Sequence, residues 1–391
     1  MDDGLHSQEM AAPCIMTGTE LPKSKARQLE GVVAYFYAFD VAYDMQQRPV
    51  ATLLGQRLEP FQIDPRKRSP RGQNFFRPLM ATLPPLERRV AGKPVRFGVT
   101  VKLLPIGALS FTVKAAFQVD EISQLAHWHD LGFDDGGTLV SWVKQLAESA
   151  RQELIPFAIR PHLQLPEGEF YTVFCLQADS LDLKLEAVDW LAANRAGIAA
   201  VLTNERGPHR LSAQEIEGST SHTLSYYQHD LVVVDWDCAL VIDHPSDFPE
   251  TLYVLELANV QLEELEAYDT VIDAALERAY RDLSVPRRFR KSSVLHELKE
   301  LRMDLARFSD DLQNITKFFG EWHLARVYEH TSRIFHLTDW HRAIDEKLKT
   351  LDSLYETLKQ DQNHRVMLWM EAAIVLMFVL DLVMIFRGLG K

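Results

Sequence analysis

Three histidines lie where a repeating apolar pattern would ordinarily place leucine. His323, His330 and His341 belong to a seam of residues spaced four and three apart between residues 323 and 358. Protonating an imidazole there would put charge into a packed interface, which is the chemistry of a pH-sensitive switch. As zinc ligands on one helix, His323 and His330 would be about 10 Å apart, so neighbouring helices or subunits would have to complete a site. We expect partly exposed seam residues at a bundle edge.

Two basic clusters stand out from an acidic chain. Such clusters can bind RNA phosphates, particularly beside aromatic residues, or anionic lipid headgroups, although a solvated loop is the simplest interpretation. They indicate a possible protein or RNA partner at these loops. The clusters comprise Arg66, Lys67, Arg68 and Arg71 in a proline-rich stretch, and Arg287, Arg288, Arg290 and Lys291 after a predicted helix.

Glu371 and Asp381 are ionisable residues inside an apolar run, ten residues or about 15 Å apart along a helix. A charge at the centre of a bilayer costs several kcal/mol unless it is paired, protonated or shielded by protein. The simplest interpretation places both near the two membrane interfaces. The alternative is that they face other copies of the same helix, which implies a homo-oligomer.

Motifs of nucleotide binding, of serine hydrolases and of zinc proteases are absent from the sequence. The three cysteines, Cys14, Cys175 and Cys238, are widely spaced and form no metal or disulfide pattern. We therefore expect no cofactor, no metal and no enzymatic activity. An enzyme using Asp40, Asp44 or His127 remains the alternative, resting on residue type alone.

The run that contains the two acids spans residues 366–386, and only five residues follow it. At about 1.5 Å per residue, these 21 residues can cross a bilayer as one helix. We predict a single-pass tail anchor that contacts membrane lipid. Lys347, Lys349, Lys359 and Arg365 precede the run. Their excess over Arg387 and Lys391 favours a cytoplasmic N-terminal body, which we expect at a bacterial inner membrane.

Composition is that of an ordinary folded chain. Hydrophobic residues make up 47% and charged residues 25% of the 391 residues, and the net charge is -13. That charge argues against a protein that coats nucleic acid over its whole surface. Residues 1–30 carry neither a secretory signal nor an organelle transit peptide, and their composition predicts disorder.

The pattern over residues 31–247 predicts an α+β domain. Strands are predicted over 32–45, 95–103, 108–119 and 169–176, and a strand pair or long bent strand over 230–243. Pro105 and Gly107 predict a hairpin between the second and third of these. Helices are predicted over 138–154 and 186–203, whereas six prolines predict a loop across 64–94.

Residues 250–364 predict an antiparallel helical bundle or coiled-coil stalk. A first helix covers about 250–283, and an unbroken heptad seam runs from Val294 to Phe319 in a second. The third begins near Glu321 and contains no proline or glycine before the end of the apolar run. One continuous helix over 321–386 and a break near 361–364 are both permitted.

Residues 230–386 resemble the required-for-meiotic-nuclear-division family, one member of which supports translation in mitochondria. The resemblance is carried by Trp322, Tyr328, Arg342, Lys347 and Leu348, with Arg365 before the span and Glu371 within it. It implies a mixed α/β region, a helical region and one C-terminal span, and an oligomeric membrane-anchored scaffold without established enzymatic activity.

The sequence thus predicts a self-associating scaffold that displays its α+β domain at the cytoplasmic membrane face to recruit a partner, with a possible link to translation through the resemblance. Self-association would use helices between residues 250 and 386. A transport protein similar to the CorA magnesium channels is an alternative. Those channels need two spans and a Gly-Met-Asn signature, and this sequence has one span and no such tripeptide.

Overall fold

The computed structural model describes residues 28–46, 48, 50–61, 78–181, 186–284 and 322–388. Within them, a nine-stranded sheet has the strand order β11-β12-β13-β10-β1-β8-β7-β6-β5, and all neighbours are antiparallel except β10 and β13. The strands of this sheet are β1 (Leu29–Asp40), β5 (Glu59–Pro60), β6 (Leu79–Val90), β7 (Lys93–Leu103), β8 (Ala108–Val119), β10 (Glu169–Gln177), β11 (Thr223–Leu224), β12 (Leu231–Val234) and β13 (Cys238–Asp243). Two short pairs accompany it, β2 (Ala42–Met45) with β9 (Ala158–Pro161) and β3 (Thr52–Leu53) with β4 (Gln56–Arg57).

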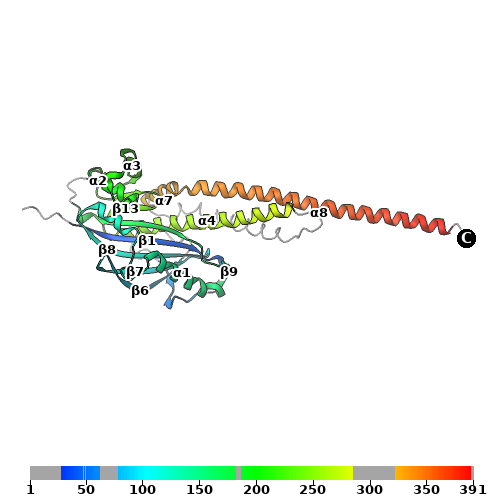
Figure 1. Ribbon diagram of the computed structural model, residues 1–391, viewed down its shortest axis with the longest axis horizontal. Coiled ribbons are helices and arrows are strands. Elements are labelled where there is room, and N and C mark those ends of the chain that lie inside the picture. Colours follow the sequence, from blue (N-terminus) through cyan, green and yellow to red (C-terminus); the bar gives the residue numbers. More distant parts are fainter. Residues whose placement is uncertain are drawn as a thin grey trace, which may run out of the picture.

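Helices cover both faces of the sheet, which makes an α+β fold with three layers (Figure 1). One face packs against α1 (Leu139–Leu154) and α2 (Ala187–Leu202), and the other against α4 (Phe248–Ser284), α7 (Trp322–Ile334) and α8 (Leu337–Gly388). The remaining helices of the described ranges are α3 (Ala213–Ser219) and the 3-10 turns η1 (Ile122–Trp128), η2 (Ile155–Phe157), η3 (Ala178–Ser180) and η4 (Pro208–Arg210).

Side chains that alternate along β1 contribute to two hydrophobic cores, one on each face of the sheet. Tyr35 and Phe39 belong to the cluster that includes α1 and α2, whereas Ala34 and Phe36 belong to the cluster that includes α4, α7 and α8. Successive strand residues point to opposite faces, so one apolar strand serves both layers. The first predicted strand divides after Asp40, where β2 leaves to pair with β9.

Local signals in the sequence account for several elements. The helix predicted over 138–154 is α1, which buries Leu139, Val143 and Ala150, and the Thr138 side chain accepts from the backbone N–H of Ser141 to cap it. The predicted hairpin is β7–β8, and Gly107 in its turn has φ +96°. A Cβ at Gly107 would lie 1.8 Å from the carbonyl oxygen of Ala42, so only glycine fits there.

The loop predicted across 64–94 is wrong for its second half, because residues 79–90 form β6. The β6–β7 register shifts between Leu83 and Leu86, so Pro84 and Pro85 occupy an irregularity where fewer ladder hydrogen bonds are made. On its other side β6 pairs with β5 only at Leu79 and Met80, which leaves the prolines at an edge. The disorder predicted over 1–30 falls mainly on residues outside the described ranges, and β1 begins at Leu29.

The third predicted helix is neither continuous over 321–386 nor broken near 361–364. It breaks at residues 335–336 and then continues through 361–364 to Gly388. Phe335 is buried against the rings of Tyr171 and Trp236, at centroid distances of 5.0 Å and 6.2 Å. His336 has φ +51°, a left-handed conformation that ends the helical repeat. Docking onto the sheet therefore sets the break.

α4 and α8 run side by side in the same direction (Figure 1). Lys347 pairs with Asp269 and Asp273 at 2.6 Å and 2.7 Å, and Leu351 is buried with Ala275 further along. The first and third helices of an up-down-up bundle have this relation. The predicted second helix, with its Val294–Phe319 seam, lies outside the described residues.

Candidate functional site

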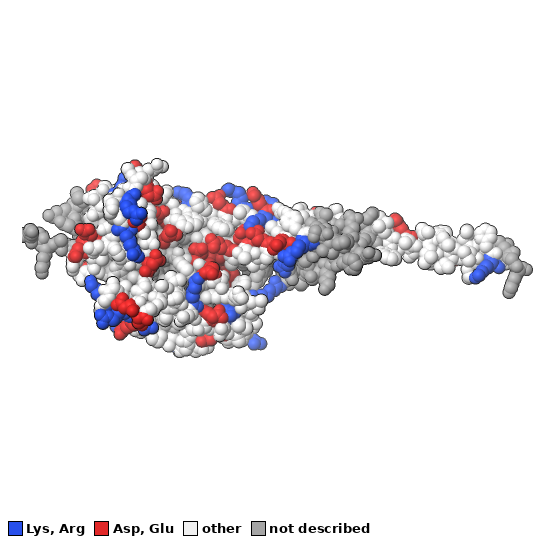
Figure 2. All heavy atoms as spheres, in the orientation of Figure 1, with Lys and Arg blue, Asp and Glu red and all other residues white. Residues whose placement is uncertain are grey.

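The most exposed apolar part of the described chain is the end of α8. Met367–Gly388 is 22 residues long with a mean hydropathy of 2.3, and none of its most apolar window is buried. Figure 1 shows it projecting beyond the sheet, and Figure 2 shows charged side chains scattered over the body and almost absent from the projection. Of the helices in the described ranges, this one alone is long and apolar enough to cross a membrane.

Glu371 and Asp381 both lie on this projection, and both are exposed. Ten residues at 100° each place them about 80° apart around the helix axis and about 15 Å apart along it. Neither acid therefore lies near the folded body or near the seam histidines.

Of the seam histidines, His323 and His330 lie on α7 and His341 lies on α8. The His323 ring is 5.4 Å from Tyr226, and the His330 ring is 5.7 Å from His222. Burial lowers the pKa of His330, which the neighbouring His222 lowers further, and burial also lowers the pKa of His341. Within the described ranges, no three His, Cys, Asp or Glu side chains are placed to hold a metal ion.

The basic clusters fall outside the described residues, so Arg66, Lys67, Arg68, Arg71, Arg287, Arg288, Arg290 and Lys291 have no structural assignment. The three residues considered for catalysis are not brought together. Asp40 ends β1, whereas His127 lies in η1, which follows the end of β8 that pairs with the start of β1. About eleven strand residues, roughly 36 Å, separate those two ends of the sheet.

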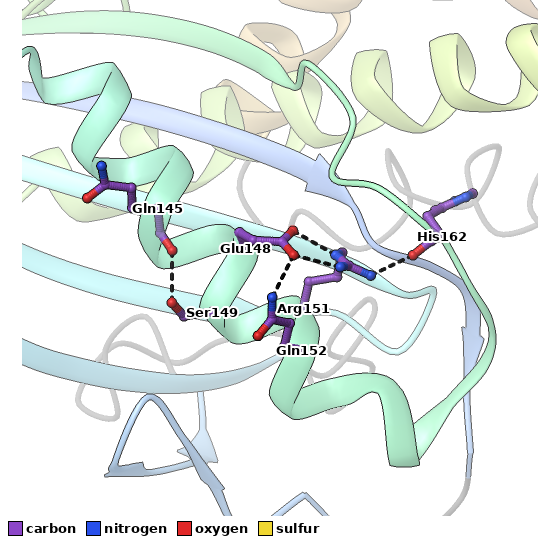
Figure 3. A network of polar contacts seen from close by, with 6 residues as sticks. All are labelled: Gln145, Glu148, Ser149, Arg151, Gln152 and His162. Atoms are coloured by element: carbon purple, nitrogen blue, oxygen red, sulfur yellow. Dashed lines mark hydrogen bonds and ion pairs between the residues drawn. The ribbon is translucent and has the colours of Figure 1, made fainter.

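Asp40 instead meets His162, a residue that the sequence did not single out. The His162 Nε2 atom lies 3.0 Å from Asp40 Oδ2, and the Asp40 backbone N–H donates to Glu263 Oε1 at 3.1 Å. Arg151 on α1 donates to the His162 carbonyl oxygen at 2.7 Å, and Glu148 holds its guanidinium at 2.8 Å and 2.6 Å (Figure 3). This polar path joins α1 to α4 at one end of β1.

Asp40 and Glu263 in this path also belong to a larger set of carboxyl groups between the sheet and α4. We call this set the carboxylate layer: Asp40, Glu169, Glu263, Glu264 and Glu266. Burial raises the pKa of Glu263 to about 8, and it raises the pKa of Glu264 far above its ordinary value. Burial, then the charge of Glu266, raises the pKa of Glu169 to about 8. Within the described part of the chain, Asp40 Oδ1 and Glu264 Oε1 are buried without a hydrogen-bond partner.

The chemistry available to the layer is proton binding. A buried carboxylate oxygen without a donor is costly, and a bound proton removes its charge and supplies a donor. His162 is the basic side chain that touches the layer, and its hydrogen bond to Asp40 raises its pKa. The described thiols offer no nucleophile, because Cys175 and Cys238 are buried and burial raises the pKa of both.

The spacing of polar residues along α4 is a signal in the sequence that could have indicated the carboxylate layer. Glu256, Asn259, Glu263 and Glu266 recur three and four residues apart, which puts polar side chains along one stripe of α4. Glu256, Asn259 and Glu263 are buried on it. Such a stripe is easily read as a solvated face, and only the fold shows that strands cover it.

The folded protein should lose stability as pH rises from 6.5 to 8.5, and Glu263→Gln should reduce that loss. The Glu263 pKa is about 8 in the fold and about 4.3 in an unfolded chain. Between those values the fold holds a proton that the unfolded chain has released, so stability is greatest at the acid end and falls toward pH 8. We expect the variant to be more stable than the wild type at pH 8.5 by on the order of 2–4 kcal/mol.

Denaturant unfolding of the full chain in detergent at several pH values measures this effect. The histidines with lowered pKa act in the opposite direction, but only below their ordinary pKa of about 6.5. Glu277→Gln, an exposed acid on the same helix, is the matched control and should keep the wild-type profile. A wild-type stability that stays level or rises across this window would show that the layer holds no proton.

Comparisons with known proteins match the part of the chain that forms the sheet, and they do not cover the projecting helix. A protein from Methanocaldococcus jannaschii described as "Uncharacterized protein MJ0711" is 21% identical over 217 residues, which cover 55% of this chain and 65% of that relative. The match therefore spans just under two thirds of the relative's length. No solved structure matches the chain. The resemblance to the required-for-meiotic-nuclear-division family stays a prediction, as no comparison tests it.

The family match follows the fold closely. It covers residues 30–248, from the second residue of β1 to the first of α4, and so includes every strand of the nine-stranded sheet. By this match the chain belongs to the family described as "Uncharacterized protein MJ0711, N-terminal domain".

Proposed function

We propose that this protein is a single-pass membrane protein that holds its α+β body at one membrane face as a scaffold for a partner. The observation that carries the proposal is the exposed apolar segment Met367–Gly388, which projects from an otherwise charged surface. A soluble protein rarely exposes so large a contiguous apolar surface to water. Lipid is the environment in which that helix is stable.

The same helix that enters the bilayer also packs on the body. α8 is continuous from Leu337 to Gly388, and its first turns contact α4 through Lys347 and Leu351. α4 in turn packs on β1 and β10. About 16 residues, roughly 24 Å of helix, separate Leu351 from Met367. The body would therefore be held away from the headgroups on a short rigid arm.

Self-association is the second part of the proposal. Glu371 and Asp381 support it, since an acid in a bilayer is stabilised by facing another protein helix rather than lipid. The chain in mild detergent, examined by size-exclusion chromatography with light scattering, should have a mass that is a multiple of one chain. The double variant Glu371→Gln with Asp381→Asn should change that multiple. A wild-type monomer at micromolar concentration would remove self-association from the proposal and leave the anchor untouched.

Orientation follows from the positive-inside rule, which favours a cytoplasmic body. Partner recruitment, including the proposed link to translation, is tested by crosslinking in native membranes followed by identification of the captured proteins. A body that protease reaches only from the outer face would contradict the proposed orientation.

A further inference from the structure

α7 packs on the body through one face and ends at a break in the chain. Val327 and Thr331, four residues apart, are fully buried on that face, and α7 packs on α4 and β12. The break at residues 335–336 separates it from α8, which has its own contacts with α4 through Lys347 and Leu351. α7 can therefore move up to this break while α8 stays in place.

Two imidazole rings lie where α7 meets the edge of the sheet. The His330 ring is 5.7 Å from the ring of His222, which directly precedes β11. The carbonyl oxygen of His222 accepts from the backbone N–H of Val234 on β12 at 3.1 Å, so His222 is fixed to the sheet. The His330 side chain in turn makes a hydrogen bond with the His222 backbone. The two histidines thus span the contact between α7 and the sheet.

The packed state does not accommodate a second proton on His330. Its Nε2 atom is buried and has no hydrogen-bond partner in the part of the chain that the structure describes. An imidazolium ring would place a charge and an unpaired N–H there, which costs more than burying the neutral ring. Burial lowers the pKa of His330, and the charges of His222, Arg333 and Arg326 lower it further, although the hydrogen bond to the His222 backbone opposes them.

Carboxyl groups lie near α7, but among the described residues none forms an ion pair with His330. Glu329 pairs with Arg333 at 3.6 Å, and both side chains are exposed. Burial raises the pKa of Asp235, and the charge of His222 opposes that rise. Other carboxyl groups lie beside the first turn of α7 or beside His341 on α8: Asp230, Asp243, Asp247 and Glu250 in the first place, and Asp345 in the second.

We propose that α7 is an acid-sensitive latch, which leaves the sheet and α4 when His330 and His222 are both protonated. Two imidazolium rings at this spacing repel each other, and both are hydrated once the helix has moved away. A histidine that packing keeps neutral favours release as pH falls below about 6.5, the ordinary histidine pKa. Release uncovers the apolar surface of α4 and β12 that Val327 shares in the packed state.

Hydrogen exchange of the full chain in detergent, read by mass spectrometry at pH 7.0 and pH 5.5, tests the latch. Exchange is expressed as protection relative to the unfolded rate at each pH, which removes the effect of pH on the chemistry of exchange. His330→Leu introduces a residue that the apolar repeat favours at this position, and His222→Gln removes the exposed partner ring. His127→Gln, which changes an exposed histidine in η1, is the matched control.

In the wild type, protection of α7 should fall about tenfold between the two pH values, because one proton bound on release changes the open population by up to about tenfold per pH unit. Protection of α1 should stay constant. The fall in α7 should vanish in His330→Leu, shrink in His222→Gln and persist in His127→Gln. The proposal is overturned if α7 is equally protected at both pH values, if α1 loses protection together with α7, or if His330→Leu responds to acid as the wild type does. Should His330→Leu fail to fold, an undiminished fall in His222→Gln overturns it equally.

Discussion

Glu256→Leu should destabilise the folded protein by about 3–5 kcal/mol, a large part of the stability of an ordinary domain. Glu256 on α4 and Lys102 on β7 form an ion pair in which both side chains are buried. Ser110 and Thr112 on β8 add hydroxyl donors to Glu256 Oε1 at 2.6 Å and 3.1 Å. Without Glu256 the Lys102 ammonium group stays in the core, 4.7 Å from the Phe61 ring, with no carboxylate to neutralise it.

The double variant Lys102→Met with Glu256→Leu should recover most of that loss, because no buried charge is then left unpaired. The exposed pair of Glu277 and Arg281 provides the contrast, since Glu277→Gln should cost less than about 1 kcal/mol. Chemical denaturation in detergent, followed by circular dichroism, measures all three differences. If Glu256→Leu and Glu277→Gln cost the same, burial does not govern the energetics of this interface.

Elements set by local residues could be predicted from the sequence. The alternating apolar pattern of β7 and β8, the cap of α1 and the apolar length of the span depend on residues close together in the chain. The α+β class follows from their order. The strand pair predicted over 230–243 is β12 and β13, and the helix predicted over about 250–283 is α4.

What could not be predicted depends on contacts between distant residues. His162 meets Asp40 across 122 positions of sequence, so nothing near Asp40 indicates its partner. The break at Phe335 arises because that ring is buried against Tyr171 and Trp236 on the sheet. The acids of α4 look like a solvated stripe until β1, β7, β8 and β10 are known to cover them. In each case the sequence shows the residue and the fold supplies its surroundings.

Removing Met367 and all that follows should abolish membrane association. The segment Met367–Gly388 holds eleven Leu, Ile, Val and Phe residues, each contributing about 0.3–0.6 kcal/mol to insertion at the centre of a helix. Their sum, about 5 kcal/mol, is comparable to the roughly 5–7 kcal/mol that two acids would cost if both lay at the centre. Glu371 and Asp381 are both displaced from that centre, and Asp381→Leu should strengthen insertion.

The truncation should leave the body intact, because no residue in the apolar window of the removed segment is buried. The truncated chain should therefore unfold at the same temperature as the full chain in detergent. A large fall in unfolding temperature would mean that the segment packs on the body instead of projecting from it.

Flotation of the full and truncated chains with liposomes, repeated after an alkaline carbonate wash, measures the membrane span most directly. The full chain should rise with the vesicles before and after the wash, because an inserted helix resists it. The truncated chain should stay at the bottom of the gradient. A full chain that remains in the dense fraction, or one that the wash strips from the vesicles, would contradict the proposed anchor.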